Sequence, residues 1–409
     1  MDLYTMNENF IPDQVVDEFQ SAIWTERYSA AGDVQLVVPG SPYYIRTLKE
    51  GTYLGLAGTK EVMELQTQSI ENGLLTVVGK SMLQYLNNRI HWPRTNDASQ
   101  PVGDYTPMDG SGNVVDIQLG TLLADRVDKM VINPVPFTGT VDSPWPKLNL
   151  EWDDDKIAYL ELGAVDTTGI ARRWTVPVGP LYSVLQPLAE QDALGMTLYL
   201  ESADAELGYV LKFATYRGVD RSSANPDPNA LIRLTPNMET VSGLKEIHSI
   251  DGYKNVVYVR YQNEITVHYA EAEEFPFGLK RRVMIRDAEG EPIGTTQVPD
   301  YLSGRGGYYG GGYTRTIVGP DDIAKFREQN AKDALANNNY IKAVDGQVSQ
   351  SNPYKFGTDY GMGDILELEG ITGTLQKARV TEYIRAQDNT GEREYPTLSV
   401  ITEPPPMPG

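Results

Sequence analysis

A cluster of four side chains near the start of the chain has the residue types of a binding site or a catalytic corner. It lies in SAIWTERYSAAGDVQLVVPG, residues 21–40, which also holds a Gly-Asp turn and a strand. The cluster consists of Trp24, Glu26, Arg27 and Tyr28. Such a set could do chemistry or hold a ligand. It could equally join two parts of an assembly, because Arg and aromatic residues are enriched at interface cores.

Two glycine-containing segments are further candidates. GLLTVVGKS, residues 73–81, has five residues between its glycines where a phosphate-binding loop has four, and its Leu, Thr and Val disfavour the positive φ of a phosphate cradle. We therefore reject nucleotide binding there and predict a strand ending in a helix cap. SGRGGYYGGGYTR, residues 303–315, matches neither the phosphate-loop nor the Rossmann pattern. It is either an adaptable aromatic docking loop or a surface loop of tolerated length.

Metal and nucleophile chemistry find little support in the sequence. EWDDDK, residues 151–156, lacks the alternating ligands and central glycine of a calcium loop, so we interpret it as a solvated acidic turn. The chain has no Cys, no Gly-x-Ser-x-Gly elbow, and only three scattered His. Nothing singles out a catalytic pair among its 56 Asp and Glu. We expect no enzyme, no cofactor and no metal site.

Composition narrows the classes of protein to which the chain could belong. With 409 residues, 40% hydrophobic and 22% charged, the chain is predicted to form two to four globular domains. A net charge of −21 opposes sequence-specific nucleic-acid binding. This charge serves either solubility or a channel wall to which nucleic acid does not adhere. No window has the ~18 apolar residues of a membrane helix and no signal peptide begins the chain, so we expect folding in a cytoplasm.

Short strands and turns dominate the predicted elements. DVQLVV alternates Val34, Leu36 and Val38 on one face, and Asn72-Gly73 predicts a hairpin between the next two strands. Helices are predicted at residues 80–90 behind a Ser81 cap, at 121–132, at 180–195 with Gly195 as the stop, and at 319–339 capped by Asp321 or Asp322. Later strands are predicted at 196–202, 209–218, 254–263, 363–369, 374–387 and 395–402.

Five regions follow from these elements. Residues 1–90 form a first β-rich domain ending in a helix, and 91–240 form an α+β domain. Residues 241–275 with 356–403 form a second β domain, which residues 276–355 interrupt with the Gly/Tyr-rich loop and a helix. Residues 404–409 form a proline-rich tail.

Several motifs, in order and spacing, resemble one family. WTERYSAAGDVQLVVPG followed by VVGKSMLQYLNNRI is similar to the N-terminal signature of minor tail proteins, the baseplate hub (tail-associated hub) family, of long non-contractile-tailed actinobacteriophages. Further similarity lies in YRGVDRSS (216–223), DYGMGDILELE (359–369) and GEREYPTLSV (391–400). The Gly/Tyr-rich loop has no counterpart in this resemblance. The positions that match the N-terminal signature are Trp24, Tyr28, Gly32, Asp33, Ser81 and Arg89.

The resemblance implies an α+β, mainly β, phage tail hub fold with two small antiparallel β-barrels and inserted α+β domains. Three copies would then place six barrels in a ring. GDVQLVV and GDILELE each use Gly-Asp to open an alternating strand, a weak echo of such a duplication. We predict assembly or interface roles, not catalysis, for Trp24, Arg27, Tyr28, Asp33, Arg89, Asp220, Arg221, Tyr308, Tyr309, Tyr313 and Asp364. A contact within one barrel stays open as the alternative for Trp24, Arg27 and Tyr28.

The expected protein is a virion structural protein of the tail tip, assembled in the host cytoplasm. Its implied partners are two further copies of itself, a distal tail protein or tail tube above, tip or fibre proteins below, and the tape measure protein and transiting DNA in the channel. One alternative is a receptor- or glycan-binding module that uses the Gly/Tyr-rich loop. A tail-associated cell-wall hydrolase is the other, and we expect no room for its extra domain after EPPPMPG.

Overall fold

The computed structural model divides the chain into two compact units. The first contains residues 1–244 and 346–401, and the second contains residues 245–345 and 402–409. The structure describes residues 1–91, 104–111, 113–134, 156–157, 159–203, 208–270, 276–288, 292, 294, 296–299, 314–338, 341–348 and 353–401. The acidic turn and most of the Gly/Tyr-rich loop lie outside these residues.

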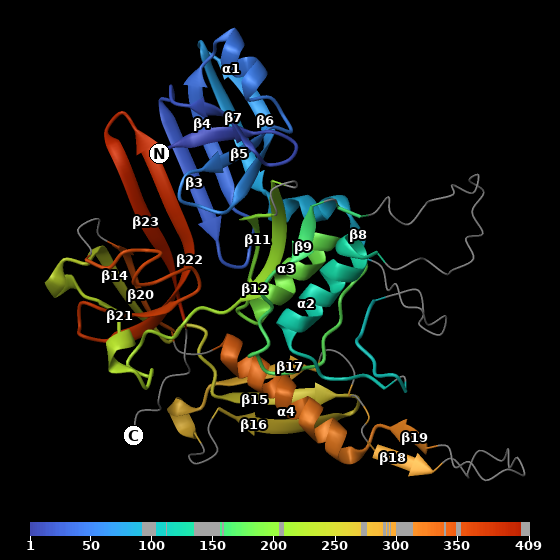
Figure 1. Cartoon of the computed structure of the whole chain (residues 1–409). Helices are drawn as coiled ribbons and strands as arrows, with labels where there is room; N and C mark the ends of the chain where they lie inside the picture. The colour runs from blue at the N-terminus through green and yellow to red at the C-terminus, as the bar shows by residue number, and fades with distance from the viewer. Residues whose placement is uncertain are drawn as a thin grey trace, which may run out of the picture. The chain divides into compact units, whose positions relative to one another are not determined.

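An 11-stranded sheet forms the frame of the first unit. Its order is β13-β21-β22-β3-β4-β7-β6-β5-β1-β2, with β23 paired to β22. The C-terminal strand β22 lies antiparallel beside the N-terminal strand β3, as the red and blue ribbons in Figure 1 show. The strands are β1 (Leu3–Met6), β2 (Pro12–Val16), β3 (Ser21–Arg27), β4 (Asp33–Pro39), β5 (Tyr53–Leu56), β6 (Val62–Glu71), β7 (Leu74–Ser81), β13 (Arg233–Leu234), β21 (Ile365–Glu369), β22 (Leu375–Asp388) and β23 (Gly391–Val400).

Local sequence explains the N-terminal half of this sheet. Val34, Leu36 and Val38 are buried along β4, as their alternation predicts. Asn72 and Gly73 have φ values of 52° and 77°, the pair of positive angles that a tight hairpin turn requires between β6 and β7. The segment that resembles a phosphate loop is strand β7, which confirms its interpretation as a strand.

The architecture is α+β and mainly β, as predicted, but the sheet is open among the described strands. The terminal strands of its order, β2 and β13, do not pair with each other. The predicted second β domain also differs from the observed pairing. Strands from 254–263 and 363–402 belong to different sheets, because β15 pairs with β16 and β17 whereas β21–β23 join the sheet of the first unit. Single-strand patterns do not encode such long-range pairing.

The α+β part of the first unit packs a small sheet against helices. β11 (Gly195–Ser202) pairs with β12 (Tyr209–Tyr216), and β12 pairs in parallel with β9 (Leu160–Leu162). α2 (Leu119–Val127), its continuation η2 (Asp128–Ile132) and α3 (Leu181–Gln191) share their apolar core. The remaining elements are α1 (Pro42–Thr47), η1 (Met82–Asn88), η4 (Pro228–Ala230), η5 (Pro236–Met238), and the pair β8 (Ile90–His91) with β10 (Gly179–Pro180).

One predicted helix start in this part is confirmed and one predicted helix end is wrong. Ser81 is the N-cap position of η1, as predicted, but its Oγ accepts the backbone N–H of Gly32 at 3.1 Å and makes no cap hydrogen bond. α3 stops at Gln191, and Ala193 takes the positive φ of 48° that Gly195 was expected to supply. Gly195 begins β11, where a side chain would collide with the ring of Tyr28, so its lack of a Cβ serves packing.

The second unit combines a three-stranded sheet with one long helix. β15 (Val256–Tyr261) lies between β16 (Glu264–Tyr269) and β17 (Val283–Asp287), and α4 (Pro320–Asn337) packs on it. The N-cap of α4 is Gly319, whose N–H donates to Asp322 at 2.9 Å, so the predicted Asp cap is wrong by position. The other elements are η6 (Gly278–Lys280) and β18 (Thr296–Pro299) with β19 (Thr314–Ile317). The paired strands β14 (Val241–Ser249) and β20 (Ile341–Val348) each contain the boundary between the two units. In the described part of the chain no helix is long and apolar enough to cross a membrane.

Candidate functional site

Two of the predicted interface residues lie in the interior of the first unit. Trp24 on β3 is fully buried in the sheet's apolar core, and Tyr28, directly after β3, is 2% exposed. A side chain buried within its own chain has no surface to offer a neighbour. Both rings therefore contribute to contacts within the chain, the alternative that the sequence leaves open.

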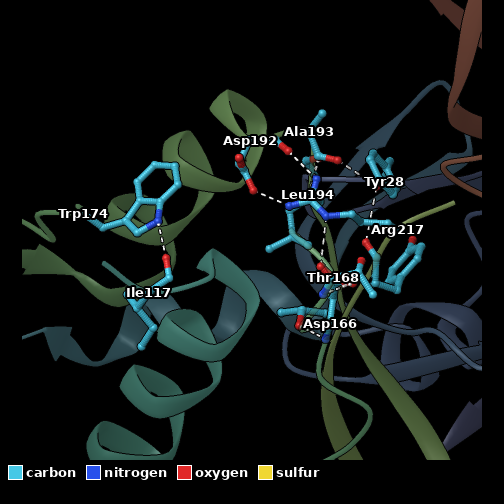
Figure 2. A network of polar contacts seen from close by, with 12 residues as sticks. Tyr28, Ile117, Asp166, Thr168, Trp174, Asp192, Ala193, Leu194 and Arg217 are labelled. Atoms are coloured by element: carbon cyan, nitrogen blue, oxygen red, sulfur yellow. Dashed lines mark hydrogen bonds and ion pairs between the residues drawn. The ribbon is translucent and has the colours of Figure 1, made fainter. Parts of the chain in front are cut away.

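Tyr28 joins three parts of the first unit. Its hydroxyl lies 2.9 Å from the carbonyl oxygen of Ala193, to which it donates a hydrogen bond (Figure 2). Its backbone N–H donates to Thr381 on β22 at 2.9 Å, and its carbonyl accepts from Met196 on β11 at 3.0 Å. Gly363 has a φ of +85°, and a Cβ there would lie 2.2 Å from the Tyr28 ring. Tyr28 is thus a junction between β3, the start of β11 and the C-terminal strands.

An arginine and two aspartates extend this junction into the α+β part (Figure 2). Arg217, which follows β12, donates through Nε to Asp166 at 3.0 Å and through Nη1 to the Asp192 carbonyl at 2.7 Å. Burial opposes the charge of Arg217, but the carboxylates of Asp192 and Asp166 raise its pKa. Thr168 completes the site by donating from its Oγ1 to Asp166 at 2.6 Å. The arrangement fixes the turn after α3 against β12.

The predicted residue Asp364 forms a second polar centre just before β21. Its carboxylate is 6% exposed, pairs with Arg221 Nε at 2.5 Å, and accepts the backbone N–H groups of Val219 at 2.7 Å and Gly361 at 3.0 Å. Asp220, next in the motif, accepts the N–H of Ser222 at 2.9 Å. Burial opposes ionisation of Asp220, but bonds from Ser222 and the charge of Lys377 lower its pKa. The structure therefore brings three predicted residues, Asp220, Arg221 and Asp364, into one contact region.

The predicted residues Arg27 and Asp33 form a partly exposed ladder across β22, β3, β4 and β7. Arg27 donates to Asp33 Oδ2 at 2.8 Å and to Glu382 Oε1 at 2.7 Å, and Lys80 lies 3.2 Å from Asp33. Burial opposes ionisation of Asp33, but Arg27 and Lys80 outweigh it and lower its pKa. These contacts lie within one chain and tie the strands edge to edge.

A buried carboxyl group lies beside this ladder. Among the residues that the structure describes, none forms a hydrogen bond with the Oε2 atom of Glu61. Burial, reinforced by the charge of Glu26, raises the pKa of Glu61 well above its usual value. The folded chain therefore holds the proton of Glu61 more tightly than a solvent-exposed glutamate does.

His91 is a second buried titratable group in this unit. Its Nδ1 lies 2.8 Å from the Pro177 carbonyl. Burial, with a smaller effect of the Arg126 charge, lowers the pKa of His91 to about 4. The ring is therefore neutral near pH 7, when it can donate from Nδ1.

The remaining predicted residues are Arg89 and three tyrosines. Arg89 follows η1, and its carbonyl accepts the N–H of Leu181 at 2.8 Å. Tyr308, Tyr309 and Tyr313 lie outside the described residues. Within the described part of the chain, no group of three His, Cys, Asp or Glu has metal-binding geometry.

Sequence reasoning missed several residues that complete the centres. Arg217 stands inside the motif at 216–223, so its charge next to Tyr216 was an available signal. Glu367 accepts from Arg233 at 2.8 Å and from the Ser223 N–H at 2.8 Å, and it is the single inward carboxylate of ILELE that could have been noticed. Asp166 and Asp192 carry no local signal, because their roles come from tertiary contacts.

The fold and its polar centres thus define a mainly β protein whose paired charges join distant segments of the chain. The family described as Siphovirus ReqiPepy6 Gp37-like protein matches residues 2–397. The chain therefore belongs to this family, which confirms the resemblance to siphovirus tail proteins drawn from the motifs. No curated protein matches the chain.

Solved structures similar to the chain include three tail proteins. The 43 kDa tail protein of prophage MuSo2 from Shewanella oneidensis shares 10% identity, with 97% of each chain covered and a TM-score of 0.49. The tail protein from Neisseria meningitidis MC58 shares 9% identity, covering 97% of this chain and 95% of that one, with a TM-score of 0.46. The prophage tail protein gp18 from Listeria monocytogenes EGD-e shares 9%, covering 97% and 94%, also at 0.46.

Proposed function

We propose that this siphovirus-family chain is the baseplate hub at the phage tail tip, a homotrimer that adapts a sixfold tail tube to a threefold tip. The observation that carries the proposal is the family match over residues 2–397. In this proposal the chain contacts a distal tail protein or the tube above and tip or fibre proteins below. The tape measure protein and the leaving DNA then pass through its channel.

Two similar Gly-Asp strand openers support the proposed adaptation from sixfold to threefold symmetry. Gly32-Asp33 opens β4 and Gly363-Asp364 precedes β21 in the same sheet, and each aspartate pairs with an arginine of a neighbouring segment. Two related strand openers within the first unit would let three chains present six related positions. This is the arithmetic that a sixfold-to-threefold adaptor requires.

The acidic composition gives the channel a specific role in the proposal. A net charge of −21 repels phosphate backbones, so a lumen lined by carboxylates lets DNA leave without adhesion. A trimer structure with a neutral or basic lumen would contradict this part.

The proposed role is structural, without catalysis. The carboxylates of Asp166, Asp192 and Asp364 are each paired with an arginine, which commits them to holding segments together. The purified chain is expected to leave host cell walls intact in a dye-release assay, with a lytic hydrolase as positive control. Dye release above the buffer level would favour the hydrolase alternative.

A second function is favoured by one cleft. An open, polar cleft of about 790 Å³ next to α1 is lined by amide, hydroxyl and charged side chains beside the ring of Tyr53. Planar polar groups beside an aromatic ring suit a saccharide, the glycan-binding alternative for a tail-tip protein. Surface-glycan binding by the wild-type chain that Tyr53→Ala abolishes, in a folded variant, would support this reading.

The copy number in tails tests the hub proposal. Quantitative mass spectrometry of purified tails is expected to give three copies of this chain per tail, and antibody labelling is expected at the tip. Labelling along the tail shaft, or a copy number that follows the tube subunit, would contradict the hub.

A further inference from the structure

Among the described residues of the second unit, α4 packs on one face of the three-stranded sheet. Val257 and Val259 of β15 pack with Ala331 and Ala334 of α4 in one apolar cluster. Neighbouring positions along a strand point to opposite faces, so Tyr258 points away from α4.

The strand register identifies the residues that share the face of Tyr258. Tyr258 is opposite Val267 on β16 and Ile285 on β17. Arg260 is opposite Ile265, and Val256 is opposite Val283. We call the face formed by Tyr258, Ile265, Val267, Val283 and Ile285 the bare face. The fully buried Val256 and the exposed Arg260–Asp287 ion pair lie on the same face.

The bare face exposes apolar surface on both flanking strands. Ile265 is 56% exposed, Val267 41%, Val283 37% and Ile285 59%. A sheet with a helix on one side is stable when its second apolar face is also covered, and contiguous exposed apolar patches mark interaction sites. Four aliphatic side chains at register positions of one small sheet form such a patch.

The rim of the bare face carries aromatic and basic groups. Arg281 donates from Nη2 to the Tyr258 hydroxyl at 3.0 Å, and its guanidinium lies 5.7 Å from the centre of the Tyr269 ring. Lys280 and Arg282 flank it, and the turn before them exposes two large apolar residues, Phe277 at 85% and Leu279 at 102%. Tyrosine and arginine are enriched at the cores of protein interfaces.

We propose that the bare face binds a second copy of this chain. The proposal rests on the hub function, because it identifies the surface through which copies meet. Charge complementarity favours this occupant: Lys280, Arg281 and Arg282 make the rim basic, whereas each chain carries a net charge of −21. In a threefold ring, contacts are head-to-tail, so the bare face of one copy meets a different, acidic surface of the next.

Solution mass as a function of concentration tests the proposal with matched variants. The double variant Ile265→Asp/Ile285→Asp places charges on the bare face and is expected to raise the midpoint of trimer dissociation at least tenfold. Phe277→Ser/Leu279→Ser changes two exposed turn residues and is expected to raise it by roughly threefold. Met238→Asp and Ile371→Asp, whose side chains are 68% and 67% exposed in the first unit, serve as controls and are expected to leave it unchanged.

The outcomes separate this proposal from the hub itself. A trimeric wild-type chain whose bare-face variants keep the same midpoint overturns the bare-face proposal and leaves the hub intact. A wild-type chain that stays at 45.4 kDa at every concentration overturns both. If far-UV circular dichroism shows that the Asp double variant is unfolded, the midpoint of trimer dissociation of Phe277→Ser/Leu279→Ser decides.

A lipid surface is the competing occupant. Wild-type chain that floats with vesicles of phosphatidylglycerol and phosphatidylcholine, and loses flotation in the turn variant without a change in mass, would assign the face to lipid. That result would overturn the proposal.

Discussion

The two Gly-Asp sites of the first unit look alike in sequence and differ in structure. The Asp33 carboxylate is 28% exposed and meets only side chains, those of Arg27 and Lys80. The Asp364 carboxylate is 6% exposed and adds two backbone N–H groups to its arginine, while Gly363 beside it packs against Tyr28. The same dipeptide is therefore a surface tie in one place and a buried anchor in the other.

The difference in burial predicts how much each aspartate contributes to the free energy of unfolding. A half-exposed ion pair contributes about 0–1 kcal/mol, whereas breaking a buried pair costs about 3–5 kcal/mol because the remaining groups lose their partners. The chain segment around 217–234 thus depends on Asp364, while β3, β4 and β7 would keep their backbone pairing without Asp33.

The largest effect is expected for Asp364→Ala. It leaves Arg221 and the N–H groups of Val219 and Gly361 without their acceptor, so we expect a loss of about 3–5 kcal/mol. Urea unfolding followed by far-UV circular dichroism measures it, with Asp33→Ala as the matched control at about 1 kcal/mol or less. Equal losses in the two variants would break the comparison.

Gly363→Ala isolates the packing of Tyr28. The new Cβ would meet the ring while the backbone keeps a φ of +85°, so we expect a loss of about 2–4 kcal/mol. Gly373→Ala is the control, since Gly373 has a φ of +79° with open space around it and is expected to lose only about 1 kcal/mol. A loss at Gly363 no larger than at Gly373 would show that the ring contact is unimportant.

Glu61→Gln tests the buried carboxyl group that lies beside the Asp33 ladder. The folded chain holds the pKa of Glu61 above its unfolded value, so its stabilising contribution is present below pH 4.5 and is lost as the pH rises through the folded pKa. The amide of Gln does not ionise and so removes this loss. At pH 7 the variant is expected to be more stable than wild type, by about 1.4 kcal/mol per unit of difference between the folded and unfolded pKa of Glu61. At pH 4 the two chains are expected to be equally stable. A variant less stable than wild type at pH 7 would contradict the assignment.

The smallest effect is expected for Asp33→Asn. The folded pKa of Asp33 lies below its unfolded value, so its contribution is present above pH 3.8 and is lost as the pH falls through the folded pKa. We expect the variant to lose about 0.5–1 kcal/mol at pH 7 and to match wild type in strong acid. Unfolding curves measured between pH 7 and pH 2 would test this, and a pH-independent difference would contradict it.

Local patterns predicted the strands well because their signals are short-range. The alternation in β4, the Asn72-Gly73 turn and the strand nature of residues 74–81 each depend on a few neighbouring residues. Asp364 and Arg221 were predicted separately as interface residues, and the sequence does not reveal that they pair within the chain.

Tertiary contacts decided what the sequence could not. The Ser81 hydroxyl bonds to Gly32 and makes no cap hydrogen bond to η1, and Gly195 leaves space for Tyr28 rather than ending a helix. Trp24 and Tyr28 have the composition of an interface, yet both are buried in their own chain. Pairing across 355 positions, as between Arg27 and Glu382, leaves no trace in either local segment.

The mass of the chain in solution over a wide concentration range, with negative-stain images of the same sample, tests the hub most directly. The account predicts a species of three times 45.4 kDa, 136.2 kDa, seen as a ring with a central hole. A 45.4 kDa particle at every concentration, without rings, would contradict it.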